Sequence, residues 1–314
     1  MINKIFKKEI FFIIFFLFYF TLSTKAEEIK IIKKINNQIV TNIDIKNEYN
    51  YLVALNNNLK NLNTEEANKI SEDSLVREII KHSEIIKFIS IEDLQNDKLI
   101  NDIIVNIYKN LNLVDLNDFE NYLKEFGISI NDVKRKISIE VAWNQLIVGK
   151  FNNQININEN ELKKRLKKEN LDSQEVLEYN LSEIVFQANN QIELDKKINQ
   201  INTSIENEGF NTAANKFSIS DTSKLGGLIG KIKENQLSKK FQEELKKVDI
   251  GNFSKPINMG NRFIILFVNE KNKINQKLNE KQILQSMIDF EKKSQFQSYS
   301  QIYFDKVKLN TEIR

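Results

Sequence analysis

Turn-forming residues are concentrated in one part of this chain. Six of its eight glycines and its only proline lie between positions 209 and 260 of 314 residues. Glycine and proline interrupt helices and strands, so this region must contain several turns. Strand-like and helical stretches alternate around the turns, beginning with Val176–Phe186 and ending with the apolar run Phe263–Val268. We therefore predict an α+β domain over residues 175–270.

The chain before this domain has the periodicity of helices. Glu28–Ile32 and Gln38–Thr41 are typical of a small hairpin, and Thr41 with Asp44 is typical of a capping box. Apolar residues then recur three and four positions apart as far as about residue 168. We predict a helical domain over residues 27–170.

The end of the chain is predicted to form one long helix, from Leu278 to about Val307. Its apolar and aromatic residues include Met287 and Phe290. A lone helix in water gains little stability, so it must find a surface to cover. We expect residues 275–314 to pack on the N-terminal helical domain.

Composition excludes several kinds of chemistry. The chain has no cysteine, which excludes disulfides, cysteine-based zinc sites and a catalytic thiol. His82 is the only histidine, and it lies on an apolar helical stripe with Ile79 and Ile86. This position favours a half-buried histidine with a local hydrogen bond over a catalytic one. No phosphate-binding or dinucleotide-binding glycine motif occurs, so we predict no cofactor and no metal.

The first 26 residues have the pattern of an export signal. A basic head precedes the 13-residue apolar run Ile10–Leu22, and Thr24-Lys25-Ala26 is typical of a cleavage site after Ala26. The run is shorter than the 18 or so residues that a membrane-spanning helix needs. We predict a cleaved signal and a periplasmic protein that meets the membrane only transiently. An uncleaved N-terminal anchor is the alternative.

The net charge does not indicate nucleic-acid binding. The signal segment carries four lysines and one glutamate, which accounts for the whole formal charge of +3. The rest of the chain is therefore close to neutral, whereas nucleic-acid-binding domains usually carry a basic stripe.

The predicted α+β domain resembles the parvulin (rotamase, PpiC-type) peptidyl-prolyl isomerase family. The family has an F-x-x-x-A-x-x-x-S run, a glycine loop, an apolar residue and a phenylalanine four apart, and a G-x-x-S-x-P turn. All four occur here in order and spacing: Phe210-Asn-Thr-Ala-Ala-Asn-Lys-Phe217-Ser218, Gly226-Gly227-Leu-Ile-Gly230, Leu237-Ser-Lys-Lys-Phe241 and Gly251-Asn-Phe-Ser254-Lys-Pro256-Ile.

The order of the whole chain resembles the SurA-like periplasmic chaperones. A signal, a hairpin-led helical domain, one parvulin domain and a terminal helix follow one another in the same way. The resemblance implies an α+β fold in which the C-terminal helix completes the N-terminal domain. It also implies partners of two kinds: unfolded outer-membrane protein precursors and proline-containing segments.

The resemblance assigns site residues as well. Leu237 and Phe241 match the family's proline pocket, with Ile229 and Phe263 as further substrate-binding residues. A polar trio, Ser220, Asp221 and Glu183, would orient the amide of the substrate.

The sequence departs from the family at two histidines. Active members carry one in the first strand, where Leu181-Ser182-Glu183-Ile184-Val185 places Glu183, and one opening the last strand, where this chain has Phe263. We therefore predict a SurA-like chaperone with weak or lost isomerase activity. The alternatives are a competent parvulin isomerase with a histidine-free site and a membrane-tethered periplasmic folding factor.

Overall fold

The computed structural model describes residues 28–91, 94, 97–168, 175–260, 262–275 and 280–314. The predicted export signal and its cleavage site lie outside these ranges. Among the helices of the described residues, none combines the length and apolar character needed to cross a membrane.

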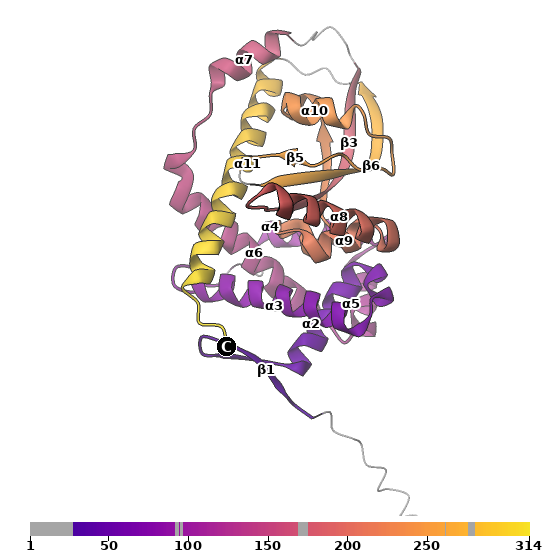
Figure 1. Cartoon of the computed structure of the whole chain (residues 1–314), viewed down its shortest axis with the longest axis vertical. Coiled ribbons are helices and arrows are strands. Elements are labelled where there is room, and N and C mark those ends of the chain that lie inside the picture. The colour runs from indigo at the N-terminus through magenta and orange to yellow at the C-terminus, as the bar shows by residue number, and fades with distance from the viewer. Residues whose placement is uncertain (1–27, 92–93, 95–96, 169–174, 261, 276–279) are drawn as a thin grey trace, which may run out of the picture.

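The N-terminal part is a hairpin followed by helices (Figure 1). The hairpin turns at Asn36, whose φ of 49° lies in the left-handed region that asparagine tolerates. Capping boxes open two of the helices, because Thr41 and Ser129 each exchange hydrogen bonds with an aspartate three residues on. The elements are β1 (Ile31–Ile35), β2 (Gln38–Thr41), α2 (Asn42–Leu55), η1 (Asn57–Asn61), α3 (Thr64–Ile85), α4 (Lys98–Asn110), α5 (Leu116–Glu125), α6 (Ile130–Phe151), η3 (Asn152–Gln154) and α7 (Glu159–Lys168).

The next part is an antiparallel sheet with strand order β4-β3-β6-β5, and the predicted α+β fold class is confirmed. Helices α8 and α9 cover one face, where Ile184 and Phe186 of β3 are buried. Helix α10 covers the other face, over Leu181. The elements are β3 (Glu175–Phe186), α8 (Gln191–Glu208), α9 (Phe210–Phe217), η4 (Asp221–Leu225), β4 (Leu228–Lys233), η5 (Glu234–Gln236), α10 (Lys239–Leu245), β5 (Ile257–Asn258) and β6 (Phe263–Asn275).

The last helix, α11 (Glu280–Leu309), touches both parts of the chain, and Figure 1 shows it running alongside them. Near its end, Trp143 Nε1 of α6 donates a 2.8 Å hydrogen bond to Ser300 Oγ. Near its beginning, it lies beside the sheet part, where the rings of Phe241 and Phe290 are 6.0 Å apart. After it, the chain pairs with β1, since Lys34 and Arg314 exchange two 2.9 Å backbone hydrogen bonds. The two ends of the described chain therefore lie together.

Buried charges join the helical part to the sheet part. Lys224 of η4 is only 8% exposed, and its Nζ lies 3.5 Å from carboxylate oxygens of both Glu78 and Glu140. In the other direction, Lys81 of α3 pairs with Asp221 of η4 as well as with Glu140. Each part therefore contributes both cations and anions to one network. The attraction between these opposite charges compensates the cost of removing them from water.

Candidate functional site

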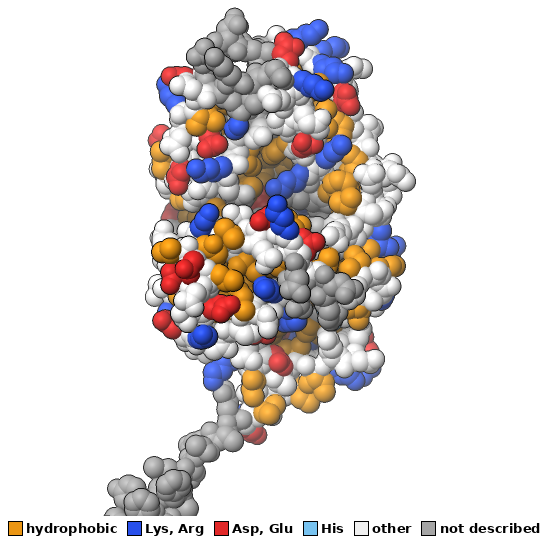
Figure 2. Space-filling model, turned by 180° about the vertical axis from the view of Figure 1, so that it is seen from behind, with side chains coloured by type: hydrophobic (Ala, Val, Ile, Leu, Met, Phe, Trp, Pro, Cys, Tyr) orange, Lys and Arg blue, Asp and Glu red, His pale blue; other side chains and the backbone are white. Residues whose placement is uncertain are grey.

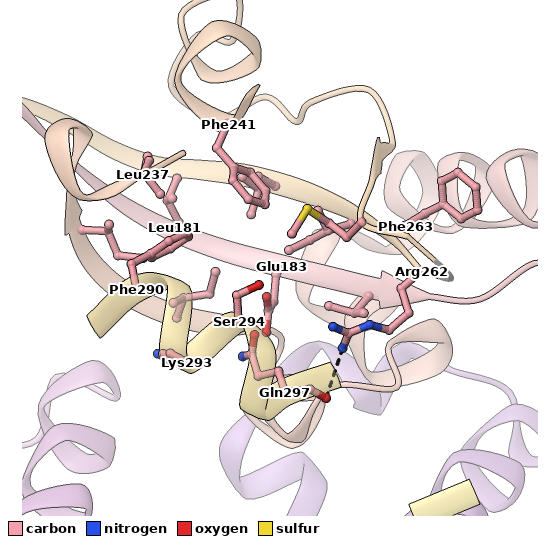
Figure 3. Close-up of a pocket in the computed structure, with 16 residues that line it drawn as sticks. Leu181, Glu183, Leu237, Phe241, Arg262, Phe263, Phe290, Lys293, Ser294 and Gln297 are labelled. Atoms are coloured by element: carbon pink, nitrogen blue, oxygen red, sulfur yellow. Dashed lines mark hydrogen bonds between the residues drawn. The ribbon is translucent and has the colours of Figure 1, made fainter. Parts of the chain in front are cut away.

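A pocket with a cavity volume of ≈ 80 Å³ lies on the α10 face of the sheet (Figure 3). Successive side chains of a strand point to opposite faces, so β3 directs Leu181, Glu183 and Val185 into this pocket. The intervening Ile184 is turned to the face that α8 and α9 cover. The strand thus supplies the floor of the pocket.

The apolar end of the pocket is formed by Leu237, which lies two residues before α10, and by Phe241 of α10. Ile229 of β4 and Met259 contribute to the same lining. All four predicted substrate-binding residues border the cavity, but Phe263 does so differently. Its ring stacks on Phe186, with centroids 5.6 Å apart, and points away from the centre of the pocket in Figure 3.

Glu183 forms the polar centre of the pocket and is 3% exposed. Its Oε1 accepts hydrogen bonds from Ser220 Oγ at 2.7 Å and from Thr222 Oγ1 at 3.0 Å. Burial raises the pKa of the Glu183 carboxyl above its ordinary value, and the two hydroxyl donors offset part of this rise. The structure therefore brings Ser220 and Glu183 together, as a buried carboxyl held by hydroxyls.

Asp221, the third member of the predicted polar trio, is not brought to Glu183. Its carboxylate is bound by Lys81 and borders a second cavity instead. Burial opposes ionisation of Asp221, but Lys81, together with the charges of Arg77 and Lys224, holds its pKa below the ordinary value. Asp221 thus contributes to the contact between the two parts of the chain.

Arg262 is a pocket residue that sequence reasoning missed. It is 8% exposed, and its Nη1 donates a 3.2 Å hydrogen bond to the backbone oxygen of Gln297 on α11. Its Nη2 donates to Ser298 Oγ, while its Nε is buried without a hydrogen-bond partner among the described residues. Burial lowers the pKa of Arg262, and the charge of Glu183 opposes this effect. In the sequence, Arg262 is a single arginine before an apolar strand, and this pattern does not indicate a residue that lines a pocket.

A larger cavity of ≈ 460 Å³ adjoins the pocket, and Arg262 borders both. It lies among α3, α6, η4 and α11, with Ile147, Phe296 and Phe304 as apolar lining. The back of the molecule is hollowed between its two halves, where basic side chains gather beside apolar ones (Figure 2). The cationic and anionic lining residues are Arg77, Lys81, Arg262, Lys292, Lys293, Asp221 and Asp289.

Neither site resembles a metal centre. In the parts of the chain that the structure describes, no group of three or more His, Cys, Asp or Glu side chains is arranged to hold a metal ion. His82 is half-buried on α3 and does not line the pocket.

Comparison with solved structures found several similar chains. A SurA-like chaperone of Campylobacter jejuni is 17% identical, with 90% of this chain and 98% of that chain covered and a TM-score of 0.33. PrsA of Bacillus anthracis, a peptidylprolyl isomerase, is 16% identical, with 76% and 97% covered and a TM-score of 0.30. A comparison with curated proteins found no match.

The family assignment rests on a different comparison. Residues 179–270 match the family model described as "Rotamase: PPIC-type PPIASE domain". This range contains all four motifs that carry the parvulin resemblance. The chain therefore carries one PPIC-type peptidyl-prolyl isomerase domain, over residues 179–270.

Proposed function

We propose that this protein is a periplasmic, SurA-like folding chaperone that binds extended segments of unfolded outer-membrane proteins. In this proposal the PPIC-type domain binds proline-containing segments but isomerises them weakly or not at all. The observation that carries the proposal is the pocket itself, which keeps an apolar end at Leu237 and Phe241 and places a buried Glu183 at its polar centre.

The polar centre favours binding over catalysis. Rotation about an X-Pro bond must cross a barrier of about 18–20 kcal/mol, and an enzyme lowers it with donors aimed at the twisted amide. The hydroxyls of Ser220 and Thr222 already donate to Glu183. They are therefore not free to donate to a substrate, and Glu183 stands where active family members have a histidine.

The larger cavity supports binding of longer segments. Barrel proteins of the outer membrane alternate apolar and polar residues along each strand. The cavity offers apolar contacts at Ile147 and Phe296 beside charged groups such as Arg77, a combination suited to such a chain. Its position between the parts of the molecule lets one segment contact both.

We also propose the domain division that goes with this function. Residues 1–26 are a signal cleaved after Ala26, 27–170 form the chaperone domain, 175–270 the parvulin domain, and 275–314 the helix that completes the chaperone domain. The hydrogen bond from Trp143 to Ser300 and the pairing of Lys34 with Arg314 support the last part.

Site-specific crosslinking tests the chaperone proposal. A photoreactive amino acid replaces Val148, which borders the larger cavity, in the chain beginning at Glu27. The control replaces Ile250, an exposed residue of the sheet part that borders neither cavity. Unfolded outer-membrane precursor should crosslink at position 148 and not at 250. Equal crosslinking at both positions, or none at 148, would contradict the proposal.

A competent isomerase is the second candidate, and Arg262 is the observation that favours it. Its guanidinium lies at the polar end of the pocket with Nε unpaired, so it could hydrogen-bond a substrate carbonyl. An isomerisation assay with a proline tetrapeptide decides between the two. Clear acceleration that is abolished in both Arg262→Met and Phe241→Ala would establish the enzyme.

A further inference from the structure

The proline pocket is not formed by the PPIC-type domain alone. Four of its lining residues belong to α11, which lies outside the family match: Phe290, Lys293, Ser294 and Gln297. Figure 3 shows the helix crossing below β3, with Phe290 near Leu237 and Gln297 near Arg262. Helix α11 therefore borders both the apolar and the polar end of the cavity.

Phe290 forms one wall of the pocket, which means that its ring lines the cavity and does not fill it. Its ring meets the ring of Phe241 edge to face, at 82° and with centroids 6.0 Å apart. A cavity of ≈ 80 Å³ remains in a lining that includes both residues. If the Phe290 side chain occupied the proline pocket, no cavity would remain beside Phe241.

The size of this space limits what it can hold. An apolar cavity of about 150 Å³ accommodates benzene. The pocket here has ≈ 80 Å³, which suits the three side-chain carbons of proline better than the seven of phenylalanine. Phe290 borders this space beside Phe241, so its ring contributes to the limit.

Several contacts hold the wall in place. Arg262 Nη1, just before β6, donates a 3.2 Å hydrogen bond to the backbone oxygen of Gln297, seven residues after Phe290 on α11. The side chain of Gln295 makes hydrogen bonds of 3.0 and 2.7 Å to the backbone of Asn156, before α7. Arg165 of α7 binds the backbone oxygen of Leu237 at 3.2 Å. Helices α7 and α11, which lie outside the PPIC-type domain, thus hold the pocket residues in position through hydrogen bonds.

We propose that Phe290 is a specificity-determining residue that completes the proline pocket and excludes larger side chains from it. The proposal rests on the proposed proline-binding function. It makes the site a composite of the PPIC-type domain and the terminal helix, in which the helix selects the ligand by size.

Calorimetric titration with two blocked pentapeptides tests this role. The peptides differ only in a central proline or phenylalanine, and each is titrated into the chain from Glu27 onward. In Phe290→Ala, affinity for the proline peptide should fall about tenfold through loss of apolar contact, and affinity for the phenylalanine peptide should rise. Tyr299→Ala is the matched control, because Tyr299 is an aromatic residue of α11 that stacks on Phe151 and lines neither cavity.

The outcomes separate this inference from the function on which it rests. Unchanged or tighter proline binding in Phe290→Ala would overturn the inference, because Phe290 would then be irrelevant or a plug. A wild-type protein that binds both peptides equally would instead refute the proposed proline-binding function, and the inference with it. Phe290→Leu, which keeps an apolar side chain on α11, should show the same exchange of preference to a smaller degree if the alanine variant fails to fold.

Discussion

Glu183 lines the pocket and also affects the stability of the folded chain. It is buried at the centre of the pocket, and burial holds its pKa above the ordinary value of 4.5. A carboxyl with a raised pKa in the folded state binds protons more tightly there than in the unfolded chain. Its ionisation therefore opposes folding, and this effect grows as pH rises above the ordinary value.

Glu183→Gln should remove this dependence. Relative to wild type, the variant should gain thermal stability as pH rises from about 4 to about 8, because the amide carries no charge to bury. Circular dichroism melting across this range measures the change. Glu175→Gln is the control, since Glu175 lies on the same strand with its side chain 61% exposed. A stability difference that stays constant with pH would show that the pKa of Glu183 is not raised.

At the scale of single elements, the caps fix where helices begin. Ser129 Oγ accepts from the Asp132 backbone, and Asp132 Oδ2 accepts from the Ser129 backbone at 3.1 Å. Helix α6 carries Trp143 and much of the helical core, so its first turn matters for the whole part.

Ser129→Ala should therefore lower the free energy of unfolding by about 1 kcal/mol, because the backbone donor loses its acceptor. Urea denaturation measures this loss. Asn131→Ala, an exposed change in the same first turn, should alter stability much less. Equal losses in the two variants would indicate that the capping box contributes nothing specific.

Elements with strong local signals could be predicted from the sequence. The capping box at Thr41 locates the start of α2, and the strand-like run Val176–Phe186 lies in β3 as predicted. Strand β4 was missed, because Gly226, Gly227 and Gly230 indicate a loop. The structure places Leu228–Lys233 in a strand, which pairs with β3.

Long-range pairing explains the other differences. The apolar run predicts a last strand over Phe263–Val268, whereas β6 continues to Asn275. The added residues are mostly polar, and they are held by β3 through register pairs such as Glu175 with Asn275. The roles of Arg262 and Phe290 also depend on tertiary contact, so no local pattern could have indicated them.

At the scale of the whole molecule, the buried charge network holds the two parts together. Burial opposes the charge of Glu78, but Lys224 and Lys136 outweigh it and hold its pKa at about 2. A carboxylate whose pKa is lowered on folding stabilises the folded state at any pH above its ordinary pKa of 4.5. This stabilisation is lost as pH falls towards 2.

Lys224→Met should destabilise the protein by about 3 kcal/mol at neutral pH, because it removes one of the cations that compensate the buried carboxylates of Glu78 and Glu140. The difference in stability between the variant and wild type should disappear as pH falls below about 4, where the carboxylates become protonated. Melting curves at several pH values measure both effects. Lys231→Met removes a lysine with its side chain 61% exposed and should change little. A pH-independent gap for Lys224→Met would argue against the network.

The central claim is that the PPIC-type domain keeps its proline pocket while isomerisation is weak or lost. Exchange NMR with one labelled proline peptide and the chain from Glu27 onward measures both properties in a single sample. The account predicts saturable shift changes at the proline, absent in Phe241→Ala, with a cis–trans exchange rate close to that of the free peptide. Fast exchange that disappears in Phe241→Ala, or no shift change at all, would contradict it.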